Sequence, residues 1–252
     1  MHAEQTRIRN PSIDFIVLVT SELAQYKVDQ LTKDGAIVIR AEDVPLSWWI
    51  STGVKRWKDQ FTKLRLLEMT QYSRVLFMDA DTLLTRPVDP IFGEQSVVHP
   101  TPSKLDLISQ IKADEAPVPA RYVFCARSDN AFAGERDHPF PPLRTERFSA
   151  GFWVAAPSHE LFDLLISVTR RYRRFDPHTM EQSLLNYVFR PNGAMPWCEL
   201  DPHWSATWPS ERDLDAGVVT LHEKFGMVGP EKLRMMWYGA LQEMREFYAR
   251  EV

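Results

Sequence analysis

The stretch Arg74-Val75-Leu76-Phe77-Met78-Asp79-Ala80-Asp81-Thr82 contains four apolar residues followed at once by two carboxylates spaced i, i+2. The apolar run is typical of a strand buried on both faces, as in a parallel sheet. Ligands of open α/β sheets bind where such strands end. Two carboxylates at this spacing can hold a hard divalent cation, which prefers oxygen ligands and commonly keeps a substrate phosphate in its shell. Asp79 and Asp81 therefore predict a metal site for a phosphate ester or diphosphate, although Asp-x-Asp also often only caps a turn.

The chain around this stretch alternates between strand-like and helix-like patterns. The order strand, helix, strand, helix, strand predicts an α/β fold with a mostly parallel, twisted sheet and flanking helices. The expected elements are strands over 13–20, 36–40 and 75–78, with helices over 22–33 and 59–70.

Proline residues punctuate residues 99–147, which we interpret as a long functional loop. A strand over 148–155 follows it. Ser158 is a candidate N-cap for a helix that runs to about residue 173. Thr179 and Gln182 have capping-box spacing for the next helix, and an amphipathic helix is expected over 230–252.

Composition excludes several classes of protein. The chain has 252 residues, enough for one large or two small domains, and its net charge of −4 argues against a nucleic-acid partner. No stretch is long and apolar enough to span a bilayer, so we expect no membrane segment and, by default, a cytoplasmic protein. The two cysteines, Cys125 and Cys198, make neither a metal-spacing pair nor a disulfide framework, which favours a reducing compartment.

Four segments, taken in order, resemble the glycogenin-like glycosyltransferases of family 8, and their sequences are most similar to those of filamentous-fungal members. They are Phe-Thr-Lys-Leu-Arg-Leu at 61–66, the aspartate strand at 75–84, Phe-Ser-Ala-Gly-Phe-Trp-Val at 148–154 and Glu-Gln-Ser-Leu-Leu-Asn at 181–186. A weaker fifth match, at 221–226, contains His222. The resemblance implies a GT-A-like nucleotide-diphospho-sugar transferase fold. It also implies one domain over 1–252, made of a nucleotide and metal half at 11–98, the Pro-rich loop at 99–147, a sugar and acceptor half at 148–229 and the carboxyl-terminal helix at 230–252.

By this resemblance, Asp79, Asp81 and His222 would hold Mn²⁺, or alternatively Mg²⁺. The implied reaction is the retaining transfer of a hexose from a nucleotide-diphosphate sugar, with a UDP-sugar as the first expectation, to a hydroxyl of an unidentified glycan or protein. A Lewis acid stabilises the charge that the leaving diphosphate gains. The other implied site residues are Glu181 and Gln182 near the anomeric carbon, and Lys63, Ala80, Ser149, Ala150, Gly151 and Lys224 around the donor.

Each of these residues also has a structural interpretation. Gln182 can serve only as the capping-box partner, Glu181 can only complement the helix dipole, His222 can fill a surface or core position, and Lys63 can simply be solvated. Three tryptophans could stack on an acceptor sugar or fill the core: Trp197, Trp204 and Trp208.

The chain departs from the family at its amino terminus. The strand over 13–20 matches the family's second strand, so the first strand and helix are expected to be missing. That loss predicts an open donor pocket, an unpaired sheet edge, weak or absent transferase activity and some tendency to form homo-oligomers. If an amino-terminal anchor is also missing, the Golgi lumen becomes an alternative location. Ser149 and Glu181 replace the family's asparagine and aspartate, which also bears on catalytic competence.

Two other functions compete with transfer. One is a degenerate, non-catalytic protein that binds a sugar or nucleotide. The other is a haloacid-dehalogenase-type phosphatase, in which Asp79 would be the phosphorylated nucleophile and Asp81 the acid/base. That fold needs a later acidic pair, and Asp213 and Asp215 lack the preceding apolar strand.

Overall fold

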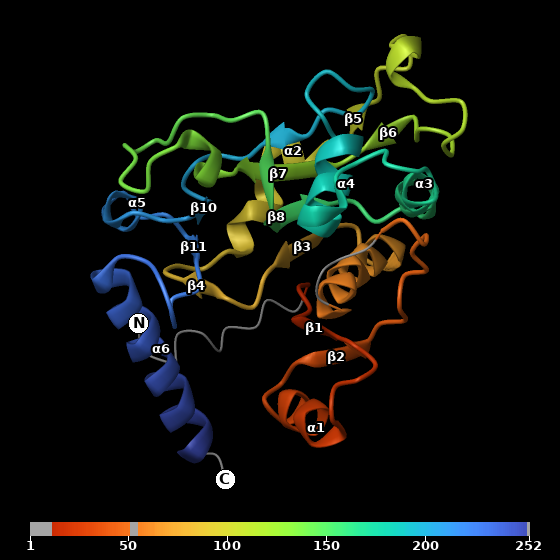
Figure 1. Ribbon diagram of the computed structural model, residues 1–252. Coiled ribbons are helices and arrows are strands. Elements are labelled where there is room, and N and C mark those ends of the chain that lie inside the picture. The colour runs from red at the N-terminus through yellow and green to blue at the C-terminus, as the bar shows by residue number, and fades with distance from the viewer. Residues whose placement is uncertain (1–11, 51–54, 251–252) are drawn as a thin grey trace. The chain divides into compact units, whose positions relative to one another are not determined.

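The computed structural model describes residues 12–50 and 55–250 (Figure 1). Their contacts divide the chain into two compact units. We call residues 1–43 with 224–252 the terminal unit, and residues 44–223 the central unit. The single domain expected over 1–252 stays a prediction.

The terminal unit contains the first part of the expected alternation. Strand β1 (Ile16–Val19) pairs in parallel with β2 (Ile37–Arg40), and helix α1 (Gln25–Lys33) connects them. Gly35, with a φ of 95°, turns the chain out of α1, in a backbone conformation that favours glycine. In the described part of the chain, β1 pairs with no strand other than β2. The predicted carboxyl-terminal helix is α6 (Glu231–Arg250).

The central unit is built on mixed sheets. Its main sheet has the order β3-β8-β7-β9, where β3 is Val75–Met78, β7 is Phe124–Ser128, β8 is Phe148–Ala155 and β9 is Cys198–Glu199. The pairs β3–β8 and β8–β7 are antiparallel, and β7–β9 is parallel. The α/β class is therefore confirmed, while the expectation of a mostly parallel sheet is wrong. A four-residue apolar run looks the same in either kind of sheet, so periodicity could not separate them.

A second sheet of the central unit has the order β10-β11-β4. In it, β4 (Thr82–Leu84) pairs antiparallel with β11 (Thr220–His222), and β11 pairs in parallel with β10 (Ser205–Thr207). The Pro-rich residues 99–147 are not one irregular loop, because they contain the fully buried strand β7. They also contribute the small antiparallel pair β5 (Thr101–Pro102) and β6 (Arg121–Tyr122).

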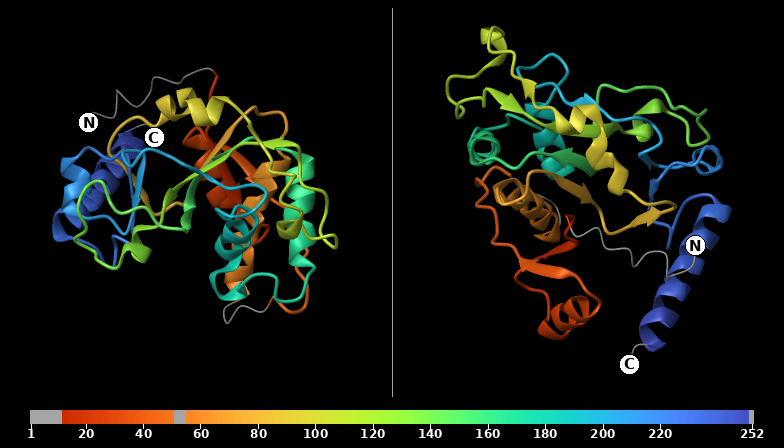
Figure 2. Two further views of the ribbon diagram at one scale, coloured as in Figure 1. Left: turned by 90° about the horizontal axis from the view of Figure 1, so that it is seen from above. Right: turned by 180° about the vertical axis from the view of Figure 1, so that it is seen from behind.

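Helices of the central unit pack together beside its main sheet (Figure 2). Helix α3 (His159–Thr169) begins after Ser158, whose hydroxyl accepts a hydrogen bond from the Leu161 amide at 3.4 Å, so the predicted N-cap is confirmed. Helix α4 (Met180–Val188) packs on β8, on α3 and on η2 (Lys55–Glu68), a 3₁₀ helix where the sequence predicted a helix over 59–70. The remaining short elements are η3 (Asp89–Gly93), α2 (Gln95–Val98), η4 (Ile108–Gln110), η5 (Asn130–Ala133), η6 (Pro177–Thr179) and α5 (Glu211–Asp215).

Among the described residues, no helix is both long enough and apolar enough to cross a bilayer. Aromatic side chains from the main sheet and its helices fill the core. Phe124 stacks on Phe189 with ring centroids 3.8 Å apart, and Phe148 lies 5.3 Å from Trp197.

Candidate metal and donor site

The first aspartate of the cluster is positioned by the end of β3. The register of β3 and β8 sets Met78 opposite Phe152. The next residue along, Asp79, donates its backbone N–H to the Gly151 carbonyl at 2.9 Å. The antiparallel pair therefore continues one residue beyond β3 and fixes Asp79 against Gly151.

The pairing of β4 with β11 brings His222 to Asp81 across 141 positions of sequence. His222 lies opposite Thr82, the residue after Asp81, and the Glu223 amide donates to the Asp81 carbonyl at 3.4 Å. As a result, His222 Nε2 lies 3.0 Å from Asp81 Oδ1 and 3.7 Å from Asp79 Oδ2. The turn between β3 and β4 (Figure 1) thus joins the two sheets at the cluster.

The three side chains suit a divalent cation. One ligand atom from each of Asp79, Asp81 and His222 lies within 4.8 Å of the others. Cations of this type take oxygen and nitrogen ligands at roughly 2.0–2.6 Å, so a single ion can reach all three atoms. The side chains of Asp79 and Asp81 are 32% and 41% exposed, which leaves the cluster open to solvent and to a substrate. The convergence expected from the sequence is present, and the binding of a metal stays a prediction.

The protonation of His222 reflects its two carboxylate neighbours. Burial lowers the pKa of His222, but the hydrogen bond to Asp81 and the charges of Asp79 and Asp81 outweigh burial and raise it overall. The two carboxylates therefore favour a proton on this imidazole when no cation is bound. A metal would take the place of that proton, because a ligating histidine must be neutral.

Gly151 provides the space in which the cluster forms. A Cβ atom at this position would lie 2.5 Å from His222 Cε1 and 2.8 Å from Asp79 Oδ2, both closer than real contacts allow. The family resemblance implies a place for Gly151 beside the donor. The structure adds a second reason for glycine here, because any larger residue displaces two of the candidate ligands.

Lys63 lies between two carboxylates, one at the cluster and one behind it. Its Nζ is 3.2 Å from Asp79 Oδ1 and 2.8 Å from Glu181 Oε1, and the side chain is only 8% exposed. Burial lowers the pKa of Lys63, but Glu181 and Asp79 outweigh burial and raise it. The interpretation of Lys63 as a solvated surface residue is therefore wrong.

Glu181 is almost fully buried in the first turn of α4. Burial raises its pKa and the charge of Lys63 opposes the rise. Because Oε1 pairs with Lys63 and Oε2 is buried without a hydrogen-bond partner, Glu181 does more than complement the helix dipole.

Gln182 and Asn186 attach α4 to the backbone of β8. Gln182 Oε1 accepts from the Ala150 amide at 3.0 Å, and Asn186 bonds both the amide and the carbonyl of Phe148 at 3.0 Å. The Thr179 hydroxyl bonds Ser183 and caps no amide, so the predicted capping box is wrong. The Ser149 hydroxyl accepts from the Gly151 amide at 3.2 Å. Residues predicted to contact the donor therefore hold β8 in shape beside the cluster.

Asp129 is a buried carboxylate next to the cluster that the sequence pattern did not identify. Burial raises its pKa, while the Ala131 amide, the charge of His222 and a hydrogen bond with Gln182 lower it. Asp129 follows β7 directly, as Asp79 follows β3. The sequence signal is weaker than at Asp79, because Arg127 and Ser128 separate Asp129 from the apolar residues of the strand, and the surrounding prolines favour a loop.

The roles predicted for the remaining residues stay predictions. Lys224 belongs to the terminal unit, and the Ala80 side chain is exposed between the two aspartates, so their donor contacts stay predictions. Trp197 is buried in the core, the Trp204 indole donates to Glu94 at 2.9 Å, and Trp208 lies under Arg136.

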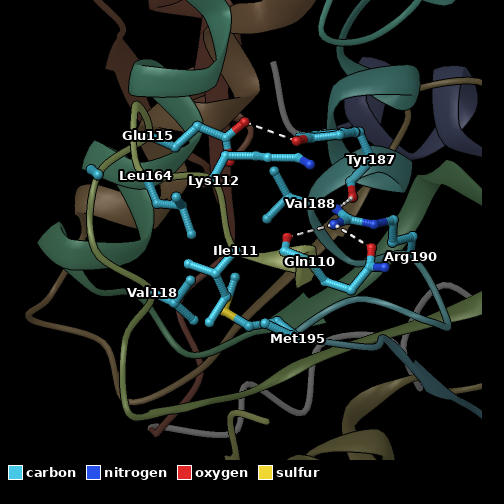
Figure 3. A pocket seen from close by; sticks show the side chains of 12 residues that line it. Gln110, Ile111, Lys112, Glu115, Val118, Leu164, Tyr187, Val188, Arg190 and Met195 are labelled. Carbon is cyan, nitrogen blue, oxygen red and sulfur yellow. Dashed lines mark hydrogen bonds between the residues drawn. The ribbon is translucent and has the colours of Figure 1, made fainter. Parts of the chain in front are cut away.

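A small cavity of the central unit shares no residue with the cluster (Figure 3). It has a volume of about 20 Å³ and lies between hydrogen-bonded pairs, Tyr187 with Glu115 and Arg190 with Gln110. This volume holds about one water molecule and no sugar.

Comparison with known proteins gives two long matches and one short one. The chain is 30% identical over 267 residues to "Uncharacterized protein C5H10.12c" of Schizosaccharomyces pombe, covering 93% of this chain and 70% of that protein. It is 27% identical over 274 residues to "Uncharacterized protein C4C3.09" of the same yeast, covering 98% and 71%. A third match, 26% identical over 90 residues, covers 36% of this chain and 14% of the Arabidopsis thaliana protein named "Putative UDP-glucuronate:xylan alpha-glucuronosyltransferase 3". No family model matches the chain. From the first of these similarities, the chain belongs to the family of the fission-yeast protein C5H10.12c.

Proposed function

We propose that this protein is a metal-dependent glycosyltransferase that moves a hexose from a nucleotide-diphosphate sugar to an acceptor hydroxyl. The observation that carries the proposal is the convergence of Asp79, Asp81 and His222 at the junction of two sheets. The short similarity to a plant protein whose name contains UDP-glucuronate and a glucuronosyltransferase supports the donor class.

The finer assignment rests on the motif resemblance. By this resemblance, the protein would have a GT-A-like fold of glycosyltransferase family 8. It would use a UDP-sugar as donor and retain the anomeric configuration. Asp79, Asp81 and His222 would bind Mn²⁺ or Mg²⁺. When bound, the cation would neutralise the diphosphate that leaves with the nucleoside. Lys63, Ala80, Ser149, Ala150, Gly151 and Lys224 are assigned to the donor, and Glu181 and Gln182 to the reacting end of the sugar.

The chain's own residues would prepare this site before the donor arrives. Lys63 pairs with Asp79 through Oδ1 at 3.2 Å, while His222 approaches the other carboxylate oxygen, Oδ2, so the ammonium holds the Asp79 side chain in place beside the cluster. Gly151 leaves the space that the His222 ring and the Asp79 carboxylate occupy. The bond from Gln182 to the Ala150 amide fixes the segment that would lie along the sugar.

The phosphatase interpretation fits this geometry less well. Asp79 is held by Lys63 and faces a histidine, whereas a phosphorylated aspartate of that kind works with a further acidic pair on the metal. Within residues 12–50 and 55–250, the candidate metal group is Asp79, Asp81 and His222 alone. A test for trapped phosphate on Asp79 is the direct check of this alternative.

A thermal-shift panel tests the donor class. We expect UDP-glucose or UDP-glucuronate to raise the melting temperature only when Mn²⁺ is present, because the metal would bridge the diphosphate to the protein. A ligand at about 100 times its Kd stabilises by about 2.7 kcal/mol, which corresponds to roughly 5–10 °C for a chain of this size. GDP-mannose has the same diphosphate on a different base, so a comparison of its shift with that of the UDP-sugars shows whether the protein recognises more than the diphosphate.

The matched variants for this panel are Asp81→Asn and Asp106→Asn. Asp106 is exposed and outside the cluster, so its variant should keep the shift, while Asp81→Asn should lose it. An equal shift in the presence of a chelator, or no shift with any UDP-sugar and Mn²⁺, would contradict the proposal.

A further inference from the structure

The two cysteines of the chain lie directly opposite each other in the main sheet. Cys125 is in β7 and Cys198 is in the parallel edge strand β9, with the two residues in register. Neighbouring strands are about 4.8 Å apart, inside the range of roughly 4.4–6.8 Å that Cα atoms span in disulfides. Both cysteines are free thiols.

The two thiols have different surroundings. Cys125 is 1% exposed and belongs to an apolar cluster with Val154 and Leu200, and its thiol lies 3.4 Å from the Ser96 carbonyl. Cys198 is half-buried at the sheet edge. One thiol is therefore reachable by a small reagent, while its partner is protected behind it.

The proximity of the two thiols also shifts their pKa values in opposite directions. The hydrogen bond from Cys125 lowers the pKa of Cys198 to about 6, and the same contact, with burial, raises the pKa of Cys125. The accessible thiol is thus the one that carries thiolate, which is the nucleophilic form.

We propose that Cys125 and Cys198 form a redox-active dithiol that is oxidised by low-molecular-weight disulfides. The Cys198 thiolate attacks one sulfur of the small disulfide, the S–S bond of that reagent breaks, and one small thiolate leaves. The Cys125 thiol then loses its proton and attacks Cys198 Sγ, which releases the second small thiol and forms the Cys125–Cys198 bond. In total, the protein loses two protons and two electrons, and the reagent is reduced to two thiols.

Such a bond would join the edge strand to the strand that precedes Asp129. Sequence spacing gives no sign of this pair, because the cysteines are 73 positions apart and only strand register brings them together. The proposal is independent of the transferase assignment, because it uses none of the residues of the metal cluster.

Oxidised glutathione is the probe for this dithiol. The full chain contains only two cysteines, so an intramolecular disulfide can only be Cys125–Cys198. After incubation we expect an intact mass lower by two hydrogens, no remaining alkylation by iodoacetamide and full recovery on reduction. At short times, peptide mapping should find a transient single glutathione on Cys198.

Two variants separate the roles of the thiols. Cys125→Ser should stop at a stable glutathione adduct on Cys198, because the resolving thiol is gone. Cys198→Ser should react at least about tenfold more slowly, because Cys125 is buried and protonated.

Three results would overturn the proposal. The first is a stable glutathione adduct on the wild type, and the second is the formation of disulfide-linked dimers in place of the internal bond. The third is that both wild-type thiols still react fully with iodoacetamide after incubation at a concentration of oxidised glutathione that modifies Cys125→Ser. Because the mass change and the transient adduct are measured on the wild type, the test does not depend on either variant folding.

Discussion

Replacement of Lys63 by methionine is expected to lower the free energy of unfolding by about 3–5 kcal/mol, the usual cost of removing one partner from a buried ion pair. The Lys63 ammonium lies 2.8 Å from Glu181, whose side chain is 3% exposed. Without it, Glu181 keeps a buried charge that no other contact in the described part of the central unit neutralises, because its second oxygen has no partner. Urea unfolding at pH 7 measures the loss.

A double-mutant cycle identifies the ion pair as the cause. Lys63→Met with Glu181→Gln should be more stable than Lys63→Met alone, because the second change removes the stranded charge. Lys104→Met is the matched control, since Lys104 is exposed, and it should shift stability by less than about 0.5 kcal/mol. If Lys63→Met and Lys104→Met lower the free energy of unfolding equally, the Lys63–Glu181 pair makes no contribution to stability.

The penalty of Lys63→Met should also depend on pH. Burial already raises the pKa of Glu181, and loss of Lys63 removes the charge that opposes the rise. A carboxyl whose pKa is raised in the folded state favours folding below its pKa and costs stability as pH increases through it. The difference from wild type should therefore be smaller at acidic pH than at pH 7.

Replacement of Gly151 by alanine is expected to weaken Mn²⁺ binding by roughly 10–100-fold, the range seen when the support of metal ligands is disturbed. The added methyl would overlap the His222 ring at 2.5 Å and the Asp79 carboxylate at 2.8 Å, so both ligands must move. Titration of Mn²⁺ into the protein, followed by electron paramagnetic resonance of the free ion, gives the dissociation constant.

Gly93→Ala is the control for this substitution. An added Cβ at Gly93 meets nothing within 4 Å, so it changes the chain by the same methyl without touching the cluster. If Gly151→Ala binds Mn²⁺ as tightly as Gly93→Ala, the account of Gly151 as the space for the ligands is wrong.

The elements that sequence predicted best are those that local chemistry decides. Strand β8 has the predicted bounds because eight consecutive residues are buried, and α3 begins after the predicted Ser158 cap. The approach of Asp79, Asp81 and His222 was expected from motif order, and strand pairing explains it.

Features set by distant pairing could not be predicted from local pattern. The direction of β8 beside β3, the buried Lys63–Glu181 pair and the register of Cys125 with Cys198 all depend on which segments meet. Gln182 shows the same limit, because its spacing from Thr179 suggested a local cap and its side chain instead bonds the Ala150 amide in β8.

The most direct test of the metal centre is a Mn²⁺ titration of the wild type, His222→Gln and His159→Gln at pH 8. His159 is exposed at the start of α3, so its variant controls for loss of an imidazole elsewhere. We predict one Mn²⁺ per chain in the wild type and in His159→Gln, with at least a tenfold weaker affinity in His222→Gln. Equal Mn²⁺ affinity in all three proteins, or no binding by the wild type, would contradict the assignment of Asp79, Asp81 and His222 as a metal centre.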